Sequence, residues 1–266
     1  PNSLALVNAN DYMPTNADGT MHFKQNTDLF WLTGVNQEET VLILFPDFPD
    51  PKMKEILFLR ETSDLIAVWE GKKLSKKEAT EVTGIENVMW LSDFPRVFRA
   101  LVTDCDNIYL QSNEHKRAEI IVETRNARFI ESCKKEYPLH TFMRLAPIIN
   151  RLRMIKSPVE IDLLQKACDL TEKGFRRVLK FTKPGVTEYE IEAEFAHEFI
   201  SNGGGFADYY PIIASGPGAC VLHYIKNDEV CKDGDLILID TGAIYGNYNA
   251  DMTRTIPVNG KFTKRQ

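Results

Sequence analysis

The sequence has few cysteines and no long apolar run, and these two absences exclude whole classes of protein. The five cysteines are odd in number and include no C-x-x-C pair, which argues against a disulfide framework or a zinc knuckle. We therefore expect reduced thiols in a cytoplasmic protein. The longest strongly apolar runs, at 41–45 and 236–239, have the length of strands, whereas a membrane-spanning helix needs about 20 apolar residues.

The sequence also lacks an excess of positive charge and the common catalytic motifs. Its formal net charge of −6 argues against a nucleic-acid partner, whose binding would need a basic surface. No G-x-S-x-G elbow, phosphate-binding loop or H-E-x-x-H helix is present. Four of the histidines show no ligand spacing and receive no role: His22, His115, His140 and His197.

The first part of the chain alternates strand-like and helix-like segments. A capping box beginning at Ser75 predicts a short helix that ends near Gly84. Helical spacing also covers 92–104 and 114–136, with one buried face formed by Ile120, Ile121, Ala127, Ile130 and Cys133. Strands are expected at 4–10, 28–34, 39–45, 55–61 and 86–91. This alternation predicts an α/β domain over residues 1–145.

A second domain is predicted over residues 146–266. Ser157-Pro158-Val159-Glu160 opens a helix that continues to about Lys180, and Thr187 caps a second helix that ends before Gly203. Strands are then expected at 209–215, 220–224, 236–240 and 250–258. Two helices followed by antiparallel strands indicate an α+β domain.

Two carboxylates in the last strands form the strongest candidate site. If the hairpin between them turns at Tyr245–Gly246, Asp240 and Asp251 are cross-strand partners whose carboxylates leave the same face of the sheet. Buried side by side, they would repel each other unless one or two divalent cations neutralised them. The alternative is that both are exposed residues beside a turn. The apolar run 236–239 favours the first interpretation, because it predicts a strand buried on both faces.

His223 and the C-terminal residues complete the set of candidates. A histidine in the expected strand 220–224 is either a hydrogen-bonded core residue or a group that faces the same cavity and stabilises an oxyanion. Thr263 and Gln266 form a capping box that predicts the start of a helix, yet no helix follows. We therefore expect a hydrolytic metal site of which this chain holds only the first part.

Taken in order, these segments resemble the pita-bread metallopeptidases, and among them the Xaa-Pro aminopeptidases. The resemblance is carried by RMIKSPVEIDLLQKACDLT at 153–171, GPGACVLHYIKND at 216–228 and LILIDTGAIYGNYNADMTRTIPVNGKFT at 236–263. HFKQNTDLFWLTGVNQEE at 22–39 resembles the creatinase-like N-terminal domain of the same enzymes. The resemblance implies an α/β creatinase-like domain followed by an incomplete α+β pita-bread domain.

The resemblance also implies roles for particular residues. Asp240 matches the first metal-binding aspartate, Asp251 the aspartate that bridges both metals, and His223 the histidine that contacts the scissile carbonyl. In the family, a hydroxide bridging two divalent ions, most often Mn²⁺, attacks the peptide bond before proline. Co²⁺, Zn²⁺ or Fe²⁺ would also suit a carboxylate-rich site. The implied substrates are short peptides with an Xaa-Pro N-terminus, and the implied assembly is a homo-oligomer, a dimer or larger.

The sequence departs from the family in what it contains. The family uses one further ligand histidine, a second active-site histidine and two ligand glutamates, none of which this chain matches, and Gly218 stands where asparagine is usual. We therefore predict that these 266 residues hold metal weakly or not at all and do not hydrolyse peptides, the activity belonging to a longer parent protein.

Three other functions remain open at this stage. A prolidase would cleave only Xaa-Pro dipeptides, and the segment 22–39 leans toward the aminopeptidase. Creatinase works without metal, so the two aspartates argue against it. A non-catalytic pita-bread binding module, like the related histone chaperones, is disfavoured by the intact Asp240 and Asp251. The least specific alternative, an α/β plus α+β protein with exposed aspartates, requires the ordered motifs to coincide by chance.

Overall fold

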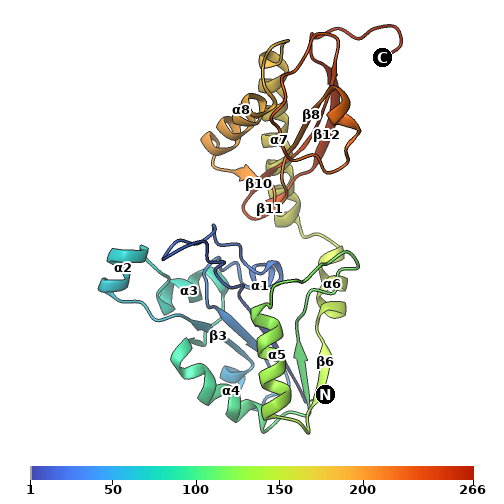
Figure 1. The fold of residues 1–266 in the computed structure, drawn as a ribbon. Coiled ribbons are helices and arrows are strands. Elements are labelled where there is room, and N and C mark those ends of the chain that lie inside the picture. The colour runs from blue at the N-terminus through green and yellow to red at the C-terminus, as the bar shows by residue number, and fades with distance from the viewer. Residues whose placement is uncertain (1) are drawn as a thin grey trace. The chain divides into compact units, whose positions relative to one another are not determined.

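The computed structural model describes residues 2–266, which form two compact units, one ending at Met154 and the other running from Ile155 to Gln266 (Figure 1). The boundary predicted at residue 145 would assign helix α6 (Ala146–Met154) to the second domain. This helix belongs to the first unit because Leu145 and Ile149 are buried in the core of that unit.

The first unit is built on a six-stranded mixed sheet. Strands β1 and β2 are antiparallel, as are β2 and β3, whereas β5 runs parallel to both β1 and β6, and β4 runs parallel to β3. The spatial order is β4-β3-β2-β1-β5-β6. The strands are β1 (Ser3–Asn8), β2 (Val41–Leu44), β3 (Glu55–Leu59), β4 (Val88–Trp90), β5 (Asn107–Leu110) and β6 (Thr141–Arg144).

Helices cover both faces of this sheet, as expected for an α/β layer domain. Alternate side chains of β1 divide between two cores: Leu4 and Leu6 face α4 and α5, whereas Val7 packs with α1, α3 and α6. The remaining elements are α1 (Thr27–Thr33), η1 (Pro51–Met53), α2 (Asp64–Glu70), α3 (Lys76–Thr83), η2 (Leu91–Asp93), α4 (Phe94–Val102) and α5 (Arg125–Glu136). The predicted helices beginning at Ser75 and within 92–104 are confirmed.

The segment 28–34, predicted as a strand, is helix α1. The Asn26 side chain accepts hydrogen bonds from the backbone N–H groups of Asp28 and Leu29, at 3.0 and 3.1 Å, and so caps the helix. The buried residues of α1 are Leu29 and Thr33, which are four apart as on one helix face. The prediction was wrong because a short apolar run without its cap does not distinguish a strand from a buried helix.

The predicted helix 114–136 begins only at Arg125. Thr124 caps it by accepting from the backbone N–H of Ala127 at 3.2 Å, and Cys133 is buried as expected. The predicted buried face was wrong at its first two positions. Ile120 lies outside the helix, and Ile121 is 90% exposed.

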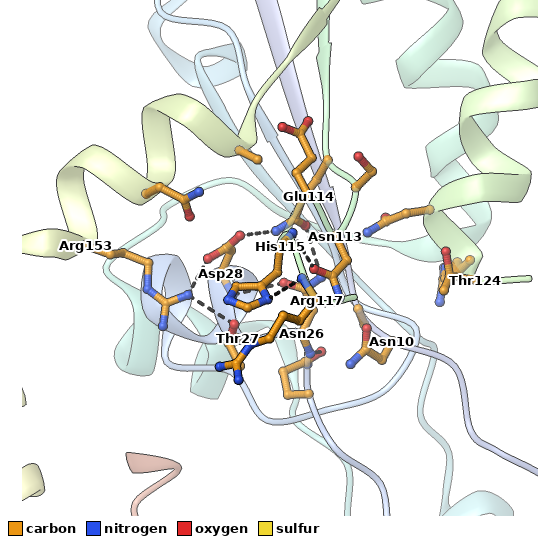
Figure 2. Close-up of a pocket in the computed structure, with 18 of the residues that line it drawn as sticks. Asn10, Asn26, Thr27, Asp28, Asn113, Glu114, His115, Arg117, Thr124 and Arg153 are labelled. Atoms are coloured by element: carbon orange, nitrogen blue, oxygen red, sulfur yellow. Dashed lines mark hydrogen bonds and ion pairs between the residues drawn. The ribbon is translucent and has the colours of Figure 1, made fainter. Parts of the chain in front are cut away.

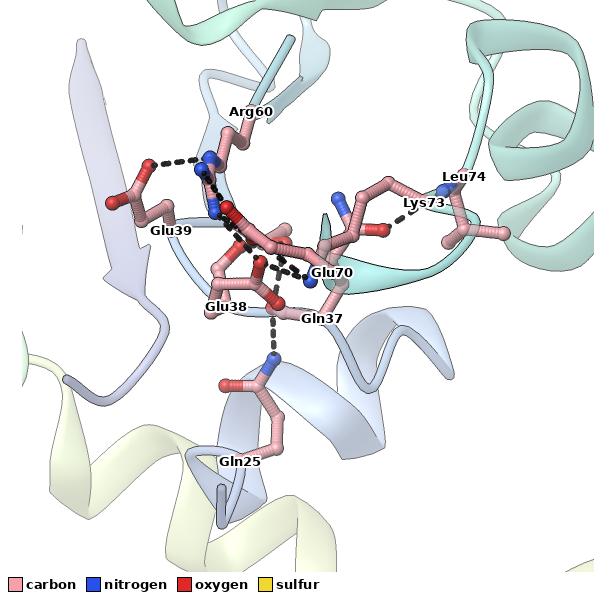
Figure 3. Close-up of polar contacts among 9 residues, drawn as sticks. Gln25, Gln37, Glu38, Glu39, Arg60, Glu70, Lys73 and Leu74 are labelled. Carbon is pink, nitrogen blue, oxygen red and sulfur yellow. Dashed lines mark hydrogen bonds and ion pairs between the residues drawn. The ribbon is translucent and has the colours of Figure 1, made fainter. Parts of the chain in front are cut away.

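A cluster of ion pairs around the buried Glu38 fastens the loop after α2 to the sheet of the first unit (Figure 3). Glu38 is buried and accepts from Arg60 at 3.2 Å and from Lys73 at 2.6 Å. Glu70 at the end of α2 binds the two terminal nitrogens of the same Arg60 guanidinium, at 2.6 and 2.8 Å. Glu38 therefore has two cations from the chain itself, which lowers the cost of burying its charge.

The second unit is α+β. Two helices, α7 and α8 in Figure 1, pack on two three-stranded antiparallel sheets. One sheet is ordered β11-β10-β7 and the other β12-β9-β8. Its elements are α7 (Pro158–Phe181), α8 (Glu188–Ser201), β7 (Gly205–Phe206), β8 (Ile212–Ser215), η3 (Gly216–Cys220), β9 (Leu236–Thr241), β10 (Ala243–Tyr245), β11 (Tyr248–Asn249) and β12 (Met252–Pro257). Both predicted helices and the expected strands at 209–215, 236–240 and 250–258 are present.

The expected strand 220–224 is absent, which corrects the placement of His223. The short helix η3 ends at Cys220, and the chain then turns through Leu222 and His223. Leu222 is 89% exposed, so the apolar residues that suggested a strand do not enter the core.

At the other end of the unit, the predicted Thr263–Gln266 capping box forms both of its reciprocal hydrogen bonds. Over the whole of residues 2–266, none of the helices combines the length and the apolar character that crossing a bilayer would require.

Candidate metal centre

The hairpin that connects the two aspartates turns one residue later than predicted. Ile244 pairs with Asn249 and Tyr245 with Tyr248, so the turn lies at Gly246–Asn247. Both turn residues have positive φ, 54° and 65°, as the two central residues of a type I′ hairpin require.

This shift changes the partner of Asp240 but not the face on which the aspartates lie. In the β9–β12 ladder Asp240 pairs with Thr253, so the predicted direct pairing with Asp251 was wrong. Asp251 precedes Thr253 by two residues, and side chains two apart on a strand leave the same face. The two carboxylates are therefore diagonal neighbours, which is close enough for them to interact.

Gly242 allows the close chain approach that carries Asp251 toward β9. A Cβ atom on Gly242 would lie 1.9 Å from the carbonyl oxygen of Ala250, so only glycine fits there. The backbone N–H of Ala250 donates to the Ala243 carbonyl at 2.9 Å and fixes the position of the residue just before Asp251.

The strand leading to Asp240 is buried on one face rather than on both. Ile237 and Ile239 are fully buried, whereas Leu236, Leu238 and Asp240 on the other face are partly exposed. The prediction of a strand buried on both faces was therefore wrong, because strict alternation cannot be read from a run of four apolar residues. The Oδ1 atom of Asp240 is nevertheless buried and has no hydrogen-bond partner among the described residues.

The electrostatics of the pair are those of two carboxylates without a counter-charge. Burial raises the pKa of Asp240 and so does the negative charge of Asp251, whereas a hydrogen bond from Thr253 lowers it. The Tyr209 hydroxyl donates to Oδ1 of Asp251 at 3.2 Å. Burial, together with both aspartate charges, raises the pKa of Tyr209, so the phenol keeps its proton. Within residues 2–266, no lysine or arginine forms an ion pair with Asp240 or Asp251.

These residues suit a hard divalent cation, but they form only part of a coordination shell. Carboxylate oxygens are the ligands that such ions prefer. Oδ1 of Asp240, which has no hydrogen-bond partner among the described residues, is available to coordinate one. Across the described part of the chain, however, no group of three or more histidine, cysteine, aspartate or glutamate side chains is arranged to hold a metal.

Of the three predicted site residues, the structure brings two together. His223 is exposed on the turn after η3, and no contact recorded for residues 2–266 joins it to Asp240 or Asp251. Tyr209, which contacts Asp251, was not predicted, because nothing in its spacing marks it. The structure brings it to the site because Ile212, three residues later, pairs with Asp240.

A cavity in the first unit has a different character. It encloses about 870 Å³ and is lined by polar side chains, including Asn10, Asn113 and His115 (Figure 2). Its two carboxylates are already paired, Asp28 with Arg153 and Glu114 with Arg144. It therefore offers a metal no free carboxylate.

Comparison with known proteins identifies the class to which this fold and site belong. Residues 162–266 match metallopeptidase family M24, and residues 1–109 match the N-terminal domain of aminopeptidase P. These two matches indicate an M24 metallopeptidase domain that follows an aminopeptidase P type of N-terminal domain.

Individual relatives agree with that assignment. The chain is 33% identical to the Xaa-Pro aminopeptidases of Escherichia coli and Haemophilus influenzae, over all of its own length and 60% and 59% of theirs. The solved structure of zinc-substituted E. coli aminopeptidase P in complex with product superimposes with a TM-score of 0.84 at 33% identity. That match covers 100% of this chain and 60% of the other. The chain thus spans about 60% of the length of the curated relatives that it matches.

Proposed function

We propose that this chain supplies the first part of the catalytic centre of a metal-dependent Xaa-Pro aminopeptidase. The observation that carries the proposal is the diagonal pair Asp240 and Asp251, with a buried oxygen that lacks a partner, on the sheet of an M24 domain. Relatives named Xaa-Pro aminopeptidase, which match the chain along all of its length, support the same activity.

The roles of the residues follow from their chemistry. Asp240 and Asp251 would each donate carboxylate oxygens to divalent cations, with Mn²⁺ as the first choice and Co²⁺, Zn²⁺ or Fe²⁺ as alternatives. When bound, such ions supply Lewis acidity and a water of lowered pKa. Tyr209 holds the Asp251 carboxylate in place, and His223 would donate a hydrogen bond to the scissile carbonyl as it becomes an oxyanion.

The 266 residues alone should bind metal weakly and leave peptides intact. Two carboxylates are fewer ligands than a pair of cations needs, and the described residues offer no third ligand beside them. Full activity would then belong to a protein that contains this chain together with the remaining ligands. We expect a homo-oligomer, and the five free cysteines favour a cytoplasmic location.

Peptide cleavage tests the proposal. The natural protein that contains this chain, loaded with Mn²⁺, should release the first residue from an Xaa-Pro-Yaa tripeptide. A prolidase would instead cleave only the Xaa-Pro dipeptide, so the two substrates should be compared at equal concentration. If neither peptide is cleaved while the protein binds Mn²⁺, the aminopeptidase assignment fails and a binding module becomes the better description.

A further inference from the structure

Glu188 is a carboxylate whose four hydrogen-bond partners come from both ends and the middle of one loop. It is the first residue of α8 and is completely buried. Oε1 accepts from the backbone N–H and the hydroxyl of Ser215, at 2.7 and 2.8 Å. Oε2 accepts from the Tyr224 hydroxyl at 2.7 Å and from the backbone N–H of Glu229 at 3.1 Å. These donors fill the acceptor positions of an ionised carboxylate, which makes its burial tolerable.

The partners of Glu188 define a loop that carries His223. Ser215 ends β8, and Glu229 lies just before Val230, which bridges to Thr187 beside the start of α8. Between them the chain forms η3 and then, over residues 221–229, neither helix nor strand. Glu188 therefore closes the base of the loop and, through Tyr224, also holds the residue next to His223.

The Tyr224 contact is the link that bears on His223. The His223 side chain is exposed, and so are Val221 and Leu222, so packing does little to fix this part of the loop. Burial and the hydrogen bond to Glu188 raise the pKa of Tyr224, so its hydroxyl stays a donor over the whole working pH range.

A second anchor holds the end of the loop independently of Glu188. Asn227 is buried and accepts from the backbone N–H of Ile213 at 3.1 Å. Its amide donates to Oε2 of Glu192 at 2.8 Å and to the Pro211 carbonyl at 3.0 Å. Loss of the Tyr224 contact should therefore release the middle of the loop without unfolding the unit.

We propose that Glu188 is a positioning residue for His223, acting through its hydrogen bond to Tyr224. The carboxylate fixes the tyrosine ring, and the tyrosine fixes the backbone that presents the neighbouring imidazole. The catalytic meaning of this arrangement rests on the proposed function, in which His223 meets the substrate carbonyl. The positioning of His223 by Glu188 and Tyr224 does not rest on that function, and it can be measured in the 266-residue chain alone.

The decisive variant is Tyr224→Phe, which removes one hydroxyl and keeps the ring. NMR of the 266-residue chain, with the His223 signals assigned from a His223→Gln spectrum, should show the imidazole becoming more mobile. Amide hydrogen exchange over residues 221–225 should accelerate about tenfold, as expected for a lost hydrogen bond to a charged group. Exchange in β8 and β9 should stay unchanged.

Two control variants separate positioning from general loosening. Ser215→Ala removes a hydrogen bond to the same carboxylate but leaves Tyr224 in place, so His223 should keep its wild-type mobility. Tyr189→Phe alters an exposed tyrosine on the same helix and should have no effect. If Tyr224→Phe leaves His223 unchanged, or if Ser215→Ala mobilises it equally, the positioning role is overturned.

Kinetics then connect the positioning role to catalysis. In the peptide-cleaving protein, Tyr224→Phe should lower kcat about tenfold with little change in KM, because a displaced imidazole weakens the transition state more than substrate binding. A mobile His223 in a protein that cleaves no peptide would overturn the proposed function and leave the positioning role standing. If Tyr224→Phe leaves kcat unchanged in a protein that cleaves peptides, the hydrogen bond between Tyr224 and Glu188 does not contribute to catalysis.

Discussion

The two units treat neighbouring carboxylates in opposite ways. In the first unit, Glu38 and Glu70 share the cations of Arg60 and Lys73, so both carboxylates have counter-charges within the chain (Figure 3). In the second unit, Asp240 and Asp251 lie side by side and no cationic side chain of residues 2–266 pairs with either.

This difference separates a structural cluster from a candidate functional one. A buried carboxylate that the chain neutralises itself holds elements together, and its removal should cost stability. A pair that the chain leaves unneutralised raises the energy of the fold until something positive binds. Removing one member of such a pair should therefore cost function and, without metal, spare stability. The predictions below test this contrast, from the largest expected effect to the smallest.

The largest effect should come from replacing the unneutralised aspartates. Asp240→Asn or Asp251→Asn in the natural protein that contains this chain should lower kcat/KM for an Xaa-Pro-Yaa peptide by about 10³, because each removes a charged ligand. Peptide release, followed by chromatography at saturating Mn²⁺, measures the loss.

Asp169→Asn is the matched control for that experiment. Asp169 is exposed on α7, and within residues 2–266 it accepts a single hydrogen bond, from Gln165 four residues away. The kcat/KM of the Asp169→Asn variant should remain within about twofold of the wild-type value. Activity losses of similar size in all three variants would mean that the site lies elsewhere.

The next effect should be on stability, in the first unit. Glu38→Gln leaves Lys73 and part of the Arg60 charge without their buried partner, which should lower the free energy of unfolding by about 3 kcal/mol. Urea denaturation of the 266-residue chain provides the measurement. Glu81→Gln breaks only an exposed pair with Lys77 at 3.9 Å and should cost less than about 0.5 kcal/mol. Equal costs for the two variants would remove the distinction between the units.

The sequence predicted the outline of the candidate site better than its details. The class of fold, both helices of the second unit and the common face of Asp240 and Asp251 could be predicted, because caps and period-two alternation are local signals. The hairpin register could not, since Tyr245–Gly246 and Gly246–Asn247 are both acceptable turns and differ by one residue.

Contacts between distant segments could not be predicted either. The bond from Tyr209 to Asp251 spans 42 residues and the bond from Tyr224 to Glu188 spans 36. Neither has a local pattern, because both depend on how β8 and α8 pack against the rest of the unit. The prediction of a strand at 220–224 was wrong for a related reason. Apolar residues such as Leu222 remain exposed in this unit, although their pattern predicted burial.

A smaller effect should appear in the pH dependence of the unfolding free energy of the metal-free 266-residue chain. The raised pKa of Asp240, caused by burial and by Asp251, means that the folded chain binds protons more tightly than the unfolded one. The unfolding free energy should therefore fall as the pH rises from about 4, the ordinary value for aspartate, through the raised pKa.

Asp240→Asn removes the titrating group and should remove this part of the decline. Thermal unfolding in the presence of a chelator, at intervals from pH 3.5 to 7, measures it for both chains. We expect the variant to be at least as stable as wild type at pH 7. Parallel pH profiles for the two chains would show that Asp240 ionises as freely in the folded state as in the unfolded state.

The smallest effect should follow from Tyr209→Phe, which removes the hydroxyl that donates to Asp251 while leaving both carboxylates in place. Groups that orient a metal ligand without touching the metal typically change affinity by about 10- to 100-fold. Because Tyr209 is partly exposed and water can replace its hydroxyl, we expect the lower end of that range. The Mn²⁺ concentration that half-restores activity to the chelator-treated natural protein measures the change, with Tyr189→Phe as the control. An unchanged Mn²⁺ requirement would mean that the diagonal arrangement of Asp240 and Asp251 depends on the strands alone, and that Tyr209 only covers the site.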